Sequence, residues 1–183
     1  MPVALLAAAV ARGAQVLGVQ ASRDGNHFQI GMQIVLAAPA AAAFVALRDY
    51  PAMRGYDPEL QAIRVETTAN PDHVRLFLTI HTCMLFFCKT IRQEQLMTAT
   101  ADADGGVLQA DFVPAAGAFR GEGTWHLRAC PRDPARTCMA LRLELEPLFW
   151  VPPVIGPWLV RKKMAEEALQ ISSGLEQRVL EAR

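Results

Sequence analysis

The sequence lacks an excess of charge of either sign. Lysine and arginine together number 18, as do aspartate and glutamate, so the formal net charge is zero. A neutral chain has no strong field that would attract a phosphate backbone or acidic lipids. We therefore expect no nucleic-acid partner.

Long apolar runs and catalytic motifs are missing as well. No stretch reaches the roughly 18 consecutive apolar residues that a membrane-spanning helix needs. The histidines show no HxH or HExxH spacing, which predicts no metal site. GxSxG motifs, glycine-rich phosphate loops and paired catalytic carboxylates are also absent. The sequence therefore predicts no catalytic residue and no cofactor.

Apolar residues, by contrast, are plentiful. They make up 52% of the 183 residues, whereas charged residues make up 20%. This composition argues against disorder and is sufficient for the core of one domain of ordinary size.

The N-terminal segment, residues 1–24, precedes a predicted domain over residues 25–183. Pro2–Val10 is apolar and Ala9-Val10-Ala11 is a small-x-small pattern, as at the end of a secretory signal peptide, but no positive residue precedes them. Two interpretations stay open. A truncated signal peptide would make the protein periplasmic or secreted, and an amphipathic helix over residues 3–17 would suit a cytoplasmic protein.

The four cysteines form no CxxC pair and match no common zinc framework. Cys83 and Cys88 bracket one predicted hairpin turn, and Cys130 and Cys138 bracket another. Cysteines that face each other across a hairpin can reach disulfide distance if the register allows it. Two hairpin disulfides and four buried free thiols both fit the sequence.

Alternation of apolar and polar side chains predicts a sheet. It is clearest where Met139, Leu141, Leu143 and Leu145 alternate with less apolar residues. The predicted strands cover residues 26–38, 63–67, 74–81, 89–97, 107–113, 123–129 and 139–146. Short turns between consecutive strands indicate antiparallel pairing.

Helices are predicted on either side of this run of strands. Pro39 ends the first strand and begins a short helix over residues 40–48, and a second short helical stretch follows near residues 51–60. A long helix is predicted over roughly residues 158–182. Its apolar stripe consists of Val160, Met164, Ala168, Ile171, Leu175 and Val179, while Lys162, Lys163, Glu166 and Glu167 belong to the polar remainder.

Four segments carry a likeness to a known fold. They are Asp49-Tyr50-Pro51, the Cys83–Cys88 hairpin, Phe119–Trp125, and Glu146–Pro153 before the long helix. Together with the element order, they resemble the START-like (SRPBCC) superfamily, which includes polyketide cyclases and coenzyme Q-binding START-type proteins, and in particular a bacterial branch that often carries signal peptides.

The resemblance implies an α+β helix-grip fold. We expect a curved antiparallel sheet of about six to seven strands around the long C-terminal helix, with two short helices after the first strand. It also implies a cavity between sheet and helix that takes an apolar ligand such as a lipid, isoprenoid or quinone.

Candidate ligand-binding residues lie in the short helical segment and at one strand start. Tyr50, Met53 and Tyr56 would gate one end of the cavity, or else close the core. Phe119 and Arg120 follow a loop, where Arg120 would bind a ligand oxygen through its forked donors, or else lie at a solvated edge or pair with a carboxylate such as Glu122.

Three further aromatic residues complete the candidate site. Trp125 lies on the apolar face of its predicted strand, as a cavity wall or a core residue. Phe149 and Trp150 are flanked by prolines and would form an apolar lip at the helix entrance, contact a membrane transiently, or simply pack the link.

Three functions are compatible with these features. The first is a non-enzymatic binding or carrier protein for an apolar small molecule. The second is a cyclase- or aromatase-like enzyme, which needs at least one titratable group that faces the cavity. The third is a structural domain with a filled core.

Overall fold

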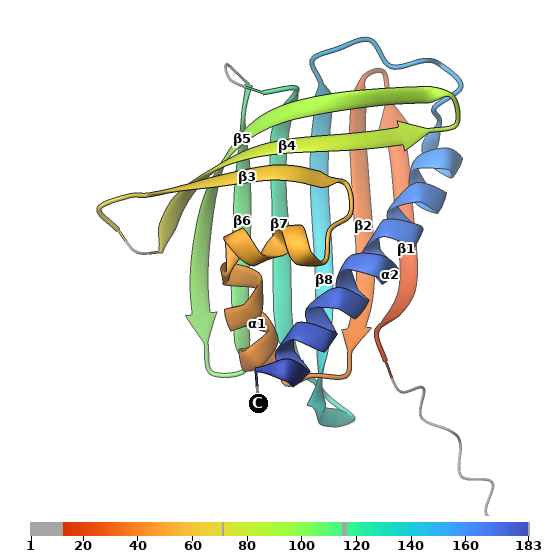
Figure 1. Ribbon diagram of the computed structural model, residues 1–183. Coiled ribbons are helices and arrows are strands. Elements are labelled where there is room, and N and C mark those ends of the chain that lie inside the picture. Colours follow the sequence, from red (N-terminus) through yellow and green to blue (C-terminus); the bar gives the residue numbers. More distant parts are fainter. Residues whose placement is uncertain (1–12, 71, 115–116, 183) are drawn as a thin grey trace, which may run out of the picture.

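The computed structural model describes residues 13–70, 72–114 and 117–182. It is an α+β structure in which one antiparallel sheet curves around a long helix (Figure 1). The strands are β1 (Gln15–Asp24), β2 (His27–Leu36), β3 (Leu60–Thr67), β4 (His73–Met84), β5 (Phe87–Asp102), β6 (Gly105–Val113), β7 (Phe119–Cys130) and β8 (Asp133–Pro147). The helices are α1 (Ala40–Arg48), the 3-10 helix η1 (Tyr50–Gly55) and α2 (Pro157–Glu181).

The order of strands in the sheet is β1-β2-β8-β7-β6-β5-β4-β3. Every neighbouring pair is consecutive along the chain except β2 and β8. Since β2 and β3 lie far apart in this order, the connection between them has to cross the sheet. It does so through α1 and η1, which lie with α2 on the same side of the sheet (Figure 1).

The sheet has eight strands, so the expected count of six to seven is wrong. The strand that the sequence did not reveal is β1, which begins at Gln15 and pairs with β2. Residues 15–17 are therefore strand rather than the end of an N-terminal helix, and the sheet starts ahead of residue 25. The signal-peptide pattern lies outside the described residues. The two short helices accordingly follow the second strand instead of the first.

The weak sequence signal of β1 has a physical cause. β1 is an edge strand, with none of its residues fully buried and with Leu17 exposed. β1 pairs with one neighbouring strand only and packs against α2, so the strand needs few large apolar side chains. The two-residue turn Gly25-Asn26, with Gly25 at a φ of +58°, is the hairpin signal that marks it.

Helix α2 buries its apolar stripe against the sheet, as predicted. Val160, Ala168, Leu175 and Val179 are buried, and Ser172 joins them. The helix meets β1 and β2 at one side of the sheet, and α1 near its C-terminal end (Figure 1). This placement leaves the first half of α2 facing the curved inner surface of β4, β5 and β8.

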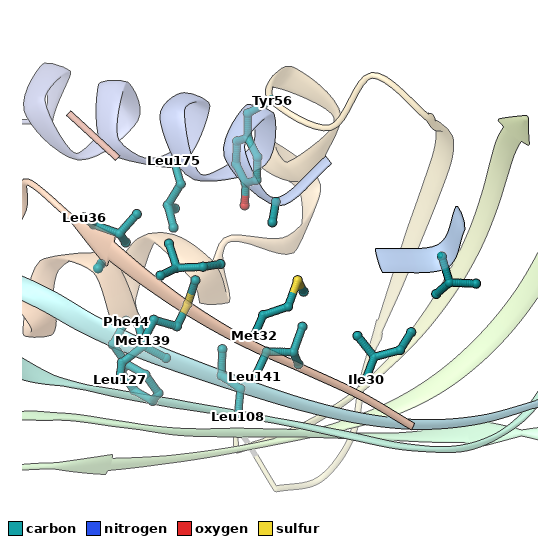
Figure 2. Packing of buried hydrophobic residues seen from close by; sticks show 14 of the residues in the cluster. Ile30, Met32, Leu36, Phe44, Tyr56, Leu108, Leu127, Met139, Leu141 and Leu175 are labelled. Atoms are coloured by element: carbon teal, nitrogen blue, oxygen red, sulfur yellow. The ribbon is translucent and has the colours of Figure 1, made fainter. Parts of the chain in front are cut away.

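The core closes at the α1 end of the sheet. The paired glycines that open β6 let α1 approach, because a Cβ on Gly106 would lie 2.6 Å from the Phe44 ring. Figure 2 shows Phe44, Leu108, Leu127 and Met139 packed together there, while Tyr56 enters beside Leu175 with its hydroxyl directed towards the strands. The closely packed side chains thus lie at the α1 end of the sheet.

Both candidate disulfides are present. Cys83 bonds to Cys88 across the β4–β5 hairpin, and Cys130 bonds to Cys138 across the β7–β8 hairpin. Cys83 and Cys88 are cross-strand partners in the register of β4 and β5. The alternative of four free thiols is therefore wrong for this structure.

Candidate functional site

A cavity of about 280 Å³ lies between the sheet and the first half of α2. Its walls follow from strand alternation, because residues two apart on one strand share a face. The strands contribute Ile80, Thr82 and Met84 from β4, Ile91, Gln93 and Gln95 from β5, and Leu143 and Leu145 from β8. Helix α2 contributes Val160, Met164 and Glu167, which recur at helical spacing.

Two loops form one end of the cavity, which we call the loop end. The β4–β5 hairpin supplies Met84 and Phe87, and the link over residues 148–156 supplies Phe149, Val151 and Ile155. Phe87 meets the Trp150 ring edge-on at 6.5 Å between centroids. Arg23 of β1 donates a hydrogen bond to the Ile155 carbonyl oxygen at 2.9 Å and so ties the link to the sheet.

The buried side chain of Gln93 fixes the part of the cavity wall at the start of β7 through hydrogen bonds. Its Oε1 accepts a hydrogen bond from the Phe119 backbone N–H at 2.8 Å, and its Nε2 donates to the Glu94 carbonyl oxygen at 2.7 Å. Gly117 packs directly on this amide. Gln93 thereby fixes the start of β7, where Phe119 faces the cavity.

Two polar side chains that face the cavity, Thr82 and Gln95, make no side-chain hydrogen bond to the described residues. Such isolated polar groups in an apolar pocket can orient a ligand without contributing most of its binding free energy.

The charged part of the wall is a cluster of three residues, Glu59, Lys163 and Glu167. Glu59 and Glu167 line the cavity, and the Lys163 ammonium forms ion pairs with Oε1 of both, at 2.9 Å to Glu167. All three side chains are about one-fifth exposed, between 19% and 21%. The cluster joins α2 to the residue before β3.

The pKa values in this cluster depart from their usual ranges. Burial raises the pKa of Glu167 to about 7, an effect that the neighbouring Glu59 increases and the Lys163 ammonium only partly opposes. Burial alone would lower the pKa of Lys163, but its hydrogen bonds to the two carboxylates raise it overall. The cavity wall thus carries a carboxyl group that exchanges a proton near neutral pH.

The fourth charged group is Lys89, also on the cavity wall. Its ammonium nitrogen lies 4.5 Å from the centre of the Phe149 ring, at the loop end. Within the described part of the chain, Lys89 has no carboxylate partner. Lys89 therefore lies at the loop end, apart from the cluster of Glu59, Lys163 and Glu167.

The structure brings two of the predicted ligand-binding residues together. Phe119 and Phe149 both line the cavity, and their rings meet edge-on with 5.6 Å between centroids. Trp150 is not among the residues that line the cavity; its ring meets that of Phe87, and 72% of its surface is exposed.

Arg120 and Trp125 lie away from the cavity wall. Arg120 points outward and forms an ion pair with Glu146 of the neighbouring strand β8 at 3.4 Å, so the expected alternative of a carboxylate partner holds, with Glu146 in place of Glu122. Trp125 is half-buried and packs between the two hydrophobic clusters of the core.

Tyr50, Met53 and Tyr56 form a group of their own around η1. All three belong to the packed core rather than to the cavity wall. Burial raises the pKa of Tyr50, and it raises that of Tyr56 to about 12. The buried Tyr56 hydroxyl has no hydrogen-bond partner among the described residues.

The sequence reasoning missed Glu59, Lys163 and Glu167 as site residues. It assigned Lys163 and Glu167 to the solvated face of the long helix, as is usual for charged helical residues. Glu167, however, follows Val160 and Met164 at spacings of seven and three, which places it on their face of the helix. That spacing was the available signal, and no comparable signal marks Glu59.

One cluster has the residue types of a metal site. Ligand atoms of His81, Cys83 and Cys88 all lie within 4.8 Å of one another. Both sulfur atoms belong to the disulfide, and a metal ion takes the thiolate form of cysteine. The disulfide form therefore does not supply a metal-binding set here.

No protein-family model matches this chain, and no curated protein matches it. Solved structures do match. The Zhui aromatase/cyclase from Streptomyces sp. R1128 is similar with a TM-score of 0.65 and 12% identity, over 86% of this chain and 96% of that one. A START superfamily protein from Mycobacterium smegmatis matches with a TM-score of 0.57 and 19% identity, over 85% and 99%.

A STAR-related lipid transfer protein from Xanthomonas axonopodis is similar as well. Its TM-score is 0.58 at 16% identity, over 89% of this chain and 99% of that one. These likenesses show that the chain has the START-like helix-grip fold, as the sequence motifs indicated. At such low identity they show the fold alone, so a function has to be argued from the cavity.

Proposed function

We propose that the protein binds or transports an apolar small molecule of lipid, isoprenoid or quinone-like character in the cavity between sheet and α2. The observation that supports this proposal is the cavity itself, whose walls are mostly aliphatic and aromatic side chains. Solved structures of the same fold include a lipid transfer protein.

The driving force for such binding is desolvation of the ligand. Burial of apolar surface contributes about 25 cal/mol per Å², so a ligand that buries about 400 Å² gains about 10 kcal/mol before the costs of association. The few polar groups on the wall would then set the orientation of the ligand.

A membrane or membrane-like surface is the source from which we expect the ligand to enter. Four side chains at the loop end form what we call the apolar rim, namely Leu85, Phe86, Trp150 and Val154, exposed by 62%, 82%, 72% and 56%. A tryptophan and a phenylalanine on such a rim suit the interface between water and lipid. Across the described residues, no helix has the length and apolarity to cross a membrane.

An oxidising compartment such as the periplasm is our proposal for where the protein works. All four cysteines are paired, and structural disulfides persist outside the reducing cytoplasm. A fusion to a reporter that is active only in the periplasm tests this location, and a fusion protein that is produced but shows no reporter activity contradicts it.

Native mass spectrometry of the protein purified from its own host tests the binding function. A lipid or quinone that co-purifies in near-stoichiometric amount, and that solvent extraction releases, is the expected result. A protein that is empty and that takes up none of a panel of added lipids, isoprenols and quinones contradicts the proposal.

A second candidate function is acid–base catalysis of the cyclase type, and the observation that favours it is Glu167. A carboxyl group with a pKa of about 7 in an apolar cavity is suited to move protons on an enolisable ketone. Hydrogen–deuterium exchange at the α-carbon of added β-diketones measures this activity. Exchange that the wild type accelerates and Glu167→Gln does not would support catalysis, and exchange equal in both variants would contradict it.

A further inference from the structure

We propose that the cluster of Glu59, Lys163 and Glu167 is the polar subsite of the cavity, and that it selects ligands whose polar end is a hydrogen-bond donor, above all a primary ammonium group, over ligands that end in a carboxylate. This inference rests on the proposed binding function. It adds the chemistry of the ligand's polar end.

The position of the cluster makes it accessible to a cavity ligand. Glu59 and Glu167 reach the wall from two different places, the residue before β3 and helix α2. Glu167 lies seven residues beyond Val160, which is about 10 Å farther from the loop end at the helical rise of 1.5 Å per residue. A ligand that entered at the loop end would place its far end beside these two carboxyl groups.

The charge count within the cluster favours a cation. Two carboxyl groups share one ammonium, since Lys163 pairs with both Glu59 and Glu167. If both carboxyls are ionised, one negative charge is left in a mostly apolar surrounding, where it costs free energy unless it is paired. A ligand ammonium group supplies the positive charge that pairs with it, whereas a ligand carboxylate adds a further negative charge and so increases the repulsion.

In the absence of such a ligand, a proton takes the place of the missing cation. Glu59 from the β3 side and Lys163 from its own helix face Glu167, and Lys89 is the remaining titratable group on the described cavity wall. The raised pKa of Glu167, about 7, is consistent with this. Binding of an ammonium ligand should then displace the proton and tighten as the pH rises through 7.

The expected size of this effect follows from linkage. A carboxyl with a pKa near 7 that must ionise on binding changes the affinity about tenfold between pH 6 and pH 8. A hydroxyl ligand needs no ionisation and should show little dependence on pH. A carboxylate ligand should bind less tightly than either.

The experiment compares 1-aminododecane, 1-dodecanol and dodecanoate by calorimetric titration of the full-length protein at pH 6, 7 and 8. Glu167→Gln keeps a side chain of the same shape without the ionisable group. Glu166→Gln is the matched control, because Glu166 is the exposed neighbour on the same helix and lies off the cavity wall. Circular dichroism verifies that both variants are folded.

The expected result is preferential binding of the amine, with a tenfold gain from pH 6 to pH 8 that Glu167→Gln abolishes and Glu166→Gln retains. Tighter binding of dodecanoate, lost in Lys89→Met, would overturn the inference and leave the binding function intact, as would equal affinity for all three probes. If no probe binds, and the host protein carries no lipid, the proposed function itself fails and the inference fails with it.

Discussion

Gly174 of α2 lies directly against Tyr56, so closely that a Cβ on the glycine would sit 2.3 Å from the Tyr56 Cβ. This contact brings the segment after η1 against the C-terminal half of α2 and closes the core between them. We expect Gly174→Ala to lower the free energy of unfolding by about 1–3 kcal/mol through overpacking. At an ordinary helical position, the same change stabilises by up to about 1 kcal/mol.

Urea unfolding measures the effect of Gly174→Ala. Ser173→Ala, at the exposed neighbouring position, serves as the control for helix propensity and should leave the stability nearly unchanged. A stabilised Gly174→Ala variant would mean that α2 and Tyr56 are not in contact.

The pKa of Glu167, raised to about 7 by burial, predicts a pH-dependent stability. Between about pH 4.5 and 7, the folded state binds more protons than the unfolded state, so the free energy of unfolding falls as the pH rises through this window. Glu167→Gln removes this loss, on the order of 1–3 kcal/mol. Relative to the wild type, the variant should therefore be more stable at pH 8 than at pH 5.

Thermal unfolding of wild type and Glu167→Gln at both pH values tests this sign. Glu166→Gln again serves as the control, with a difference that should not depend on pH. The same offset at pH 5 and pH 8 for Glu167→Gln would show that Glu167 is not buried beside Glu59.

Filling the cavity should abolish ligand binding without loss of the fold. Thr82 faces the cavity from β4, and tryptophan is well suited to a strand. Thr82→Trp should weaken binding of an apolar ligand at least tenfold, because its indole occupies the space of the ligand. Thr79→Trp, off the cavity wall on the same strand, is the matched control, and equal affinity in the two variants would place the ligand elsewhere.

The two hairpin disulfides should each stabilise the fold by about 2 kcal/mol, since both close short loops of the unfolded chain. Replacement of either pair by alanine should lower the free energy of unfolding by that amount in urea. Thiol titration of the untreated, denatured protein should find no free thiol. Four titratable thiols would contradict the pairing.

The apolar rim should govern binding to lipid vesicles. Phe86→Asp places a charge at its most exposed position and should weaken partitioning into zwitterionic vesicles about tenfold. Leu180→Asp, at an exposed apolar position near the other end of α2, is the control and should partition like the wild type. Tryptophan fluorescence, which responds to the environment of Trp150, measures both, and identical partitioning would exclude the rim as the contact.

Leu85 of the apolar rim has a strained backbone conformation. Leu85 adopts a φ of +56°, which is uncommon for a branched apolar residue. Leu85→Gly should therefore leave stability unchanged or raise it by up to about 1 kcal/mol, while it weakens vesicle binding. A large loss of stability would indicate that the Leu85 side chain packs on the fold.

Much of the fold was predictable because local patterns reflect it directly. The period of two in Met139, Leu141, Leu143 and Leu145 decides which face of β8 is buried, and the stripe that begins at Val160 does the same for α2. The cysteine pairs were also predictable as disulfide candidates, since each brackets a short turn. For the site, Phe119 and Phe149 were predicted because aromatic residues beside a loop or prolines suggest a cavity lip, and both line the cavity.

The tertiary structure alone decided the rest. Alternation tells which side chains point inward, but whether they meet or leave a space depends on the curvature of the sheet and the distance to α2. The presence of the cavity, and the positions of Arg120 and Trp125 away from its wall, were decided in this way by the tertiary structure. Glu59 and Glu167 come together from segments more than 100 residues apart, and their electrostatics arise only when burial removes water from both. The sequence thus determined the elements and their inner faces, and three-dimensional packing determined where a ligand fits and which charges it meets.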